Sequence, residues 1–409
     1  MFGKDQYEIS SKADIDLKGR YPHKNPEYWA AREMLMVGCA GDHSDEHLHG
    51  HQSRSRRDGK SATSIMMVRL GVRDEVAQAM AAEVNQCDNR AVCPESHLAT
   101  ILKIIGAQIP DRENDAVEKV LDIISAVHWK IVLGPYKPEK SFMDYVAAIV
   151  ESRRHTYVDM DALEALMGLL EEESVSISPT LFGLRSIYTS LCSVMERCPE
   201  TFPRVNVLKI MGFLIDVLYQ GQVSYHTFKR HIEASAFRPL LIPVECGREV
   251  VDIPVAIVDN PHDNPCAHKV LRAKRVCMSV VVSSIGNPSV QCGHNSIVQR
   301  GIESSMIVGM ENLTAMFRCW ELPANTRPQC NWNMMRRYGE CLNGTHYYLD
   351  DRGRFALYRG TLVHPAPRPV NRLSPRDIHM MLDQAFIPQR AELWRERMGV
   401  LDPRLFSEA

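Results

Sequence analysis

Residues 239–261 read PLLIPVECGREVVDIPVAIVDNP and mark a change in the local pattern of the chain. This stretch is rich in proline and in β-branched residues, which favour extended segments over helices. It therefore predicts strands or loops. Because the residues before it have helical periodicity, we expect the chain to divide near residue 238.

Residues 62–237 carry apolar side chains at helical spacing, which predicts a helical lobe. Examples are MMVRLGVRDEVAQAMAAEV (66–84), SHLATILKIIGAQI (96–109) and VNVLKIMGFLIDVLYQG (205–221). Ser96 is a candidate N-cap, because a serine hydroxyl can accept a hydrogen bond from the first turn of a helix.

Residues 238–372 predict a mixed second lobe. The segment RGIESSMIVGMENLTAMFRCW (300–320) predicts a helix, and HYYLDDRGRFALYRG (346–360) predicts a β-hairpin. Beyond it, Ser374, Pro375 and Asp377 form a strong helix start. The expected divisions are an N-terminal arm and mobile loop (1–61), a helical lobe (62–237), a mixed, basic lobe (238–372) and a helical tail (373–409).

The composition is that of a soluble globular protein, with 409 residues, 45% hydrophobic and 24% charged. No window is apolar enough for a membrane span, and the first residues lack the apolar region of a signal peptide. We therefore expect a protein kept in the cytoplasm or nucleus. Its twelve cysteines include no C-x-x-C pair, so we expect them to be reduced.

The net charge of −2 hides an uneven distribution of charge along the chain. Residues 262–372 contain fourteen lysines and arginines against seven acidic residues, a net charge of +7, so the remainder carries −9. A basic region within an acidic chain indicates a polyanion-binding surface.

Four cations of this region lie together in NPCAHKVLRAKRVCMSVVV (264–282). If the segment is helical, Lys269, Arg272 and Arg275 fall within an arc of about 120° and form a row that binds phosphates, with Lys274 beside it. The alternative is an ordinary solvated helix face above a buried apolar face.

Residues 42–60 are polar and rich in histidine and arginine, which predicts a mobile loop. Within it, His43, Glu46 and His47 match the H-x-x-E-H pattern of zinc hydrolases. That pattern requires a rigid helix, whereas this stretch is flanked by glycines, so we expect no catalytic metal site. Structural metal binding by His43, His47, His49 and His51 is an alternative. Nucleotide-binding, nucleophile-elbow and paired C-x-x-C motifs are absent, and we expect no enzymatic activity and no cofactor.

Five short stretches, in one order along the chain, resemble successive stretches of orthomyxovirus-type nucleoproteins. They are VMERCPETFPRVNVLKIMGFLIDVLYQG (194–221), PLLIPVECG (239–247), NPCAHKVLRAKRVCMSVVVSS (264–284), MENLTAMFRCWELPANTR (310–327) and DDRGRFALYRGTLVHP (350–365). The resemblance covers roughly residues 190–367. It implies a mainly α, two-lobed fold that coats single-stranded genomic RNA, in the virion and in the host cytoplasm or nucleus.

An RNA coat of this kind requires cations for phosphates and aromatic surfaces for bases. The candidate RNA-binding cations are Lys269, Arg272, Lys274, Arg275, Arg300, Arg318, Arg336, Arg337, Arg352, Arg354, Arg54, Arg56 and Arg57. The candidate stacking residues are Tyr338, Tyr347, Tyr348, Phe355 and Tyr358, although aromatic residues of a hairpin more often pack in a core. The resemblance also implies self-assembly and a viral RNA polymerase as partner.

The chain departs from this family in two respects. It is nearly neutral, and the stretch after Pro323 is too short for the long loop that family members insert into a neighbouring subunit. We expect the tail to join protomers instead, through an apolar stripe formed by Ile378, Met381, Leu382, Phe386, Leu393 and Trp394. The alternative is that the stripe folds back on its own chain. The rival functions are a viral capsid shell or clamp protein that does not bind RNA and the zinc hydrolase.

Overall fold

The computed structural model describes Met67 and most of the chain from residue 71 to residue 398. The described ranges are 71–90, 93–108, 113–177, 180–203, 205–235, 237–284, 286–323, 326–327, 330–340, 345, 347–350, 353–358 and 373–398. Two short parallel strands, β1 (Met36–Val37) and β2 (His47–Leu48), are the described part of the N-terminal arm. The predicted loop residues around β2 otherwise lie outside the described residues.

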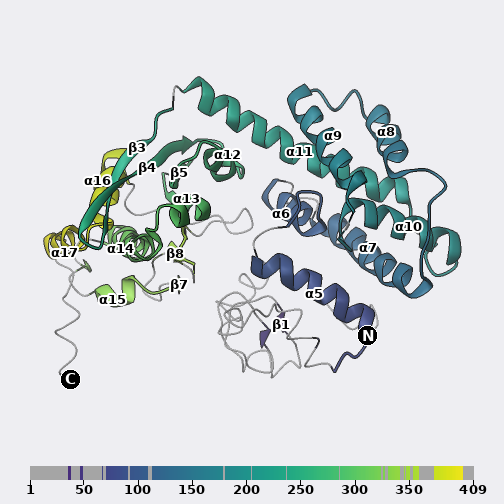
Figure 1. Ribbon diagram of the computed structural model, residues 1–409, viewed down its shortest axis with the longest axis horizontal. Helices are drawn as coiled ribbons and strands as arrows, with labels where there is room; N and C mark the ends of the chain where they lie inside the picture. Colours follow the sequence, from purple (N-terminus) through teal and green to yellow (C-terminus); the bar gives the residue numbers. More distant parts are fainter. Residues whose placement is uncertain are drawn as a thin grey trace. The chain divides into compact units, whose positions relative to one another are not determined.

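The chain divides into two units, residues 1–223 and 224–409 (Figure 1). The division lies within the long helix α11 (Val207–Ala234), whereas the sequence pattern places it near residue 238, where the strands begin. The described residues are mostly helical, with one mixed sheet in the second unit. The prediction of a mainly α fold is confirmed at this level.

The first unit is a helical assembly around one apolar core. Its helices are α5 (Glu75–Arg90), α6 (Leu98–Gln108), α7 (Glu113–Leu133), α8 (Phe142–Ser152), α9 (Met160–Val175), α10 (Leu184–Arg197) and the first part of α11. Helix α10 packs against α7, α8 and α9. It buries Leu184, Ile187 and Leu191 completely, so this helix lies at the centre of the unit.

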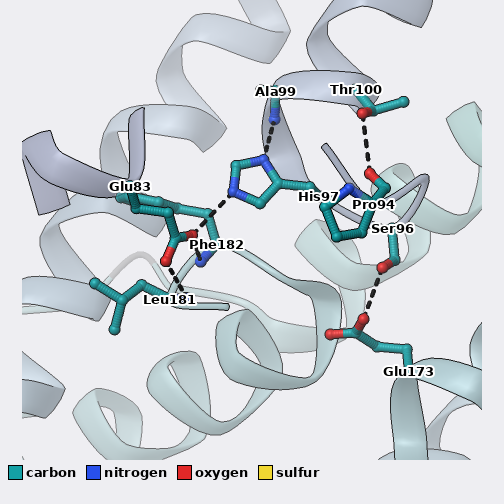
Figure 2. A network of polar contacts seen from close by, with 9 residues as sticks. All are labelled: Glu83, Pro94, Ser96, His97, Ala99, Thr100, Glu173, Leu181 and Phe182. Atoms are coloured by element: carbon teal, nitrogen blue, oxygen red, sulfur yellow. Dashed lines mark hydrogen bonds and ion pairs between the residues drawn. The ribbon is translucent and has the colours of Figure 1, made fainter. Parts of the chain in front are cut away.

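A polar network joins α5, the start of α6 and the loop before α10 (Figure 2). The Glu83 carboxylate accepts hydrogen bonds from the backbone N–H groups of Leu181 and Phe182 at 2.7 and 2.9 Å, and from His97 Nε2 at 2.9 Å. Burial raises the pKa of Glu83, but these three hydrogen bonds outweigh it and hold the pKa below its usual value. The carboxylate therefore fixes the loop while it remains charged.

The N-cap of α6 is His97, not Ser96 as the sequence predicts. The helix begins at Leu98, and the Ala99 N–H donates to His97 Nδ1 at 3.1 Å. The Ser96 hydroxyl instead donates to Glu173 at 2.7 Å. Because one ring nitrogen of His97 accepts and the other meets Glu83, both are used in holding the fold (Figure 2).

The second unit is built on a seven-stranded sheet with the order β3-β4-β5-β6-β9-β8-β7. These strands are β3 (Leu240–Cys246), β4 (Glu249–Asn260), β5 (Met278–Ser283), β6 (Pro288–Cys292), β7 (Gly339–Glu340), β8 (Tyr347–Leu349) and β9 (Phe355–Tyr358). Only the pair β4 and β5 is parallel among these pairings. Residues 239–261 thus form strands as predicted, and β8 and β9 form the predicted hairpin.

Helices cover both faces of this sheet. One face packs with α14 (Glu303–Glu321), α16 (Pro375–Ala385) and α17 (Pro388–Arg397) around a core that includes Val255 and Val280. Three shorter helices complete the unit: α12 (Ala267–Ala273), α13 (His294–Gln299) and α15 (Trp332–Met335). The opposite face packs with α12 and the end of α11 through Val258 and Val281. Adjacent positions of a strand point to opposite faces, which explains this alternation.

The predicted tail interface is wrong, because the apolar stripe packs inside its own unit. Ile378, Met381, Leu382, Phe386 and Trp394 are all buried in the core of the second unit, and only Leu393 of the predicted stripe is exposed, at 52%. Asn312 of α14 also donates to the Ala385 carbonyl at 3.0 Å. The alternative that the stripe folds back on its own chain is the one the structure supports.

Candidate nucleic-acid interface

Helix α12 connects the parallel strands β4 and β5 and lies beside β5 (Figure 1). The loop before it is fixed by Asn264, whose backbone N–H donates to Asn260 Oδ1 at 2.8 Å and whose side chain donates to the Ser224 carbonyl at 2.8 Å. Ala267, Val270 and Leu271 bury the apolar side of the helix against the sheet. The loop and the apolar side together hold α12 in place, with its other side toward solvent.

His268 attaches α12 to the sheet at two points. Its Nδ1 lies 2.8 Å from Ser279 Oγ on β5, and its Nε2 lies 2.8 Å from Ser289 Oγ on β6. Burial, and to a smaller extent the charge of Arg272, lower the pKa of His268 from 6.5 to about 4. The ring is therefore neutral at pH 7, and one serine donates to it while the other accepts.

We expect this histidine to make the second unit sensitive to acid. In the unfolded chain His268 binds a proton near its ordinary pKa of 6.5, and in the fold only near pH 4. Between these values the unfolded chain binds more protons, so stability falls as pH is lowered. The loss is about 3 kcal/mol between pH 6.5 and pH 4.

Urea denaturation of the wild type and His268→Gln at several pH values measures this effect. The variant cannot titrate at this position, so its stability should fall less steeply over that range. Parallel pH profiles for the two proteins would contradict the prediction.

The four cations of residues 264–282 are on or directly after α12. Arg272, Lys274 and Arg275 are exposed, and Lys269 is half-buried, with its Nζ over the Tyr225 ring at 5.2 Å from the ring centre. The helix ends at Ala273, and Arg275 has a positive φ of 59°. The expected single helical row is therefore wrong for Arg275, which follows the helix in a turn.

Glu233 is an acidic neighbour of this surface. Lys274 Nζ lies 3.5 Å from Glu233, and both side chains are substantially exposed. An ion pair of that kind contributes at most about 1 kcal/mol, because water screens it and both side chains lose freedom. Lys274 is therefore available to a phosphate at low cost.

The other predicted cations differ widely in their surroundings. Arg300 and Arg337 are exposed. Arg336 pairs with Glu311 at 2.6 Å, and Arg354 pairs with Glu303 at 2.7 Å. The remaining candidates Arg54, Arg56, Arg57 and Arg352 lie outside the described residues, as do His43, Glu46, His49 and His51. The structure thus brings together the four cations on and directly after α12.

The prediction that Arg318 contacts RNA is wrong. Its side chain has 0% exposure and donates to the carbonyl oxygens of Met335, Arg337 and Tyr347. A guanidinium enclosed in this way holds the core together and has no surface to offer a phosphate.

The candidate stacking residues are mostly engaged in packing. Tyr347 is buried against Phe317, with ring centres 5.0 Å apart, and Tyr348 lies 6.4 Å from Phe355. The Tyr338 hydroxyl donates to Glu311 at 2.5 Å. The side chain of Tyr358 lies outside the described residues.

Two further cations, not among the predicted RNA-binding residues, lie on the part of α11 that packs with α12. Lys229 is half-buried and Arg230 is exposed on the last turns of α11. This part of α11 and α12 share the small core of Phe228, Ile232 and Leu271. The adjacent cations in TFKRH (227–231) were visible in the sequence. The packing of α11 on α12 was not, because the strands β3 and β4 separate the two helices along the chain.

Three further properties of the described residues bear on function. No three His, Cys, Asp or Glu side chains gather as a metal site, and no helix is long and apolar enough to cross a membrane, within that part of the chain. Cys93 is disulfide-bonded, so the prediction of reduced cysteines is wrong at this residue.

The chain was compared with models of protein families, with curated proteins and with solved structures. None of the three comparisons finds a match.

Proposed function

We propose that this protein is a viral nucleoprotein that coats single-stranded RNA without sequence specificity. The observation that carries the proposal is the cluster of Lys269, Arg272, Lys274 and Arg275 on and after α12, in a chain whose remainder is acidic. Lys269 and Arg272 lie on a helix that is fixed by an apolar core and by His268, and Lys274 and Arg275 follow it directly. A cluster of this kind can bind phosphates, and contacts to phosphates carry no direct sequence information.

Assembly belongs to the same proposal. A coat requires each protomer to hold the next, and the α16 and α17 stripe is already buried, so a different surface joins the protomers. We propose the viral RNA polymerase as the partner that copies the coated RNA. The protein then acts in the virion and in the host cytoplasm or nucleus.

We expect RNA affinity to depend strongly on salt. Four phosphate contacts to a single strand predict about a 50-fold loss of affinity between about 50 and 200 mM salt, because binding releases condensed counterions. Fluorescence anisotropy with RNA oligomers of several unrelated sequences measures it. All sequences should bind alike. A capsid shell or clamp protein, the rival function, would bind none of them at either salt concentration.

Replacing the four cations around α12 by alanine should lower the affinity at least tenfold for every sequence and make it less dependent on salt. A matched control replaces four exposed cations of the first unit, Lys103, Lys137, Lys140 and Arg154, which changes the net charge by the same amount. Equal losses in both variants, with both folded by circular dichroism, would remove α12 from the RNA site.

A further inference from the structure

Tyr225 occupies a distinctive position beside the cations of α12. It lies on the part of α11 that belongs to the second unit and packs at the edge of the core of Phe228 and Leu271. Its ring is half-buried, and the Lys269 ammonium lies over it. An aromatic ring that is held by a core and is only half-buried can stack on a flat ligand such as a nucleic-acid base.

Cations on both helices are near this ring in the fold. Lys229 follows Tyr225 by four residues, about one helical turn, on α11, and Arg272 follows Lys269 by three residues on α12. The two helices share one core, and Lys269 of α12 lies over the Tyr225 ring of α11, so the ring has a cation from the neighbouring helix beside it. Proteins that bind single strands combine these two elements, a cationic track for the backbone and rings on which bases stack.

We propose that Tyr225 is a stacking platform for one unpaired base of the bound RNA. Lys269 and Arg272 hold the adjoining phosphates. In the free protein the Lys269 ammonium covers the ring. A phosphate that binds this ammonium draws it toward the RNA backbone, which the flexible lysine side chain permits, and the base takes its place on the ring. This proposal rests on the proposed function and specifies its ligand as single-stranded.

The ligand class follows from the geometry of stacking. A base within a duplex has both faces covered by its neighbours, so it cannot also cover a protein ring. An unpaired base has a free face, and every base has one. The platform therefore selects single strands without selecting sequence, whereas cations alone bind single and double strands through their phosphates.

The test compares an RNA oligomer of mixed sequence with an abasic oligomer of the same length and charge, both titrated into the full chain. The wild type should bind RNA about tenfold more tightly than the abasic oligomer, since one stacked base contributes about 1–3 kcal/mol. Tyr225→Leu keeps apolar bulk against the core and should lower RNA affinity to the abasic level, with abasic affinity unchanged. Tyr225→Phe keeps the ring and should behave as the wild type.

Each contrary outcome has a definite meaning. Equal binding of RNA and abasic oligomer by the wild type would overturn the platform and leave the proposed function standing. Equal loss of both ligands in Tyr225→Leu would assign Tyr225 to the support of α12 and likewise overturn it. Binding of neither ligand by the wild type would overturn the proposed function itself.

Discussion

A chain that lacks residues 373–409 is expected to lose the fold of its second unit. The missing residues bury Ile378, Met381, Leu382, Phe386 and Trp394 against α14 and the sheet. Each such side chain contributes about 1.5–3 kcal/mol through removal of apolar surface from water. Their sum is comparable with the total stability of a domain, about 5–15 kcal/mol. The truncated protein should precipitate or expose apolar surface.

Phe386 of the tail packs closely against α14. Its ring lies against α14 where Gly309 has no side chain, and a Cβ atom at Gly309 would overlap the ring. The Phe386 carbonyl also accepts from the Glu245 N–H of β3 at 3.1 Å. One residue therefore connects the tail to a helix and to the edge of the sheet.

Single substitutions make the expectation quantitative. Phe386→Ala should lower the free energy of unfolding by about 3–5 kcal/mol. Leu393→Ala is the matched control from the same tail, and because Leu393 is exposed its effect should be within about 0.5 kcal/mol. Urea denaturation followed by circular dichroism gives both values. A soluble truncated chain with the wild-type midpoint would show that the tail is dispensable.

The tail also shows what the sequence could and could not predict. The helix start at Ser374 was predictable, because its capping box with Asp377 depends on neighbours within four residues. The apolar stripe was predictable from its periodicity as well. Whether it packs on its own chain or on another was not, because that depends on α14, which lies more than fifty residues earlier.

The same limit applies to the site. The cluster of cations at residues 269–275 was visible as a pattern in the sequence. The end of α12 at Ala273 was not, because it depends on where the chain turns toward β5. Tyr225 belongs to a helix that is apolar over much of its length, and its position under Lys269 arises only when α11 and α12 pack together. Arg318 was indistinguishable from a surface cation in sequence, since charge alone does not reveal burial.

Arg318 leads to the second large effect. Its Nε and Nη2 donate to the Tyr347 carbonyl at 3.0 and 2.9 Å, and its Nη1 donates to the carbonyls of Met335 and Arg337 at 2.6 and 2.8 Å. The guanidinium thus links α14 by hydrogen bonds to β8, to the last residue of α15 and to the turn that follows it. These carbonyl groups would lose their donor in a buried setting if the side chain were removed.

Arg318→Met should therefore lower the free energy of unfolding of the second unit by about 3–5 kcal/mol, because it leaves buried polar groups without partners. Arg318→Lys should recover only part of this loss, since a single ammonium cannot reproduce the planar fork that reaches two segments. Arg300→Met, at an exposed arginine of the same unit, is the control and should change stability by about 0.5 kcal/mol or less.

Measurements of RNA affinity distinguish an arginine that stabilises the second unit from one that contacts RNA. Under conditions where Arg318→Met is still folded, its affinity for RNA should equal that of the wild type, because the side chain has no exposed surface. The four-residue variant at α12 should show the reverse pattern, with stability near that of the wild type and weakened binding. A specific loss of RNA affinity in folded Arg318→Met would mean that this buried guanidinium positions the RNA site as well as the core.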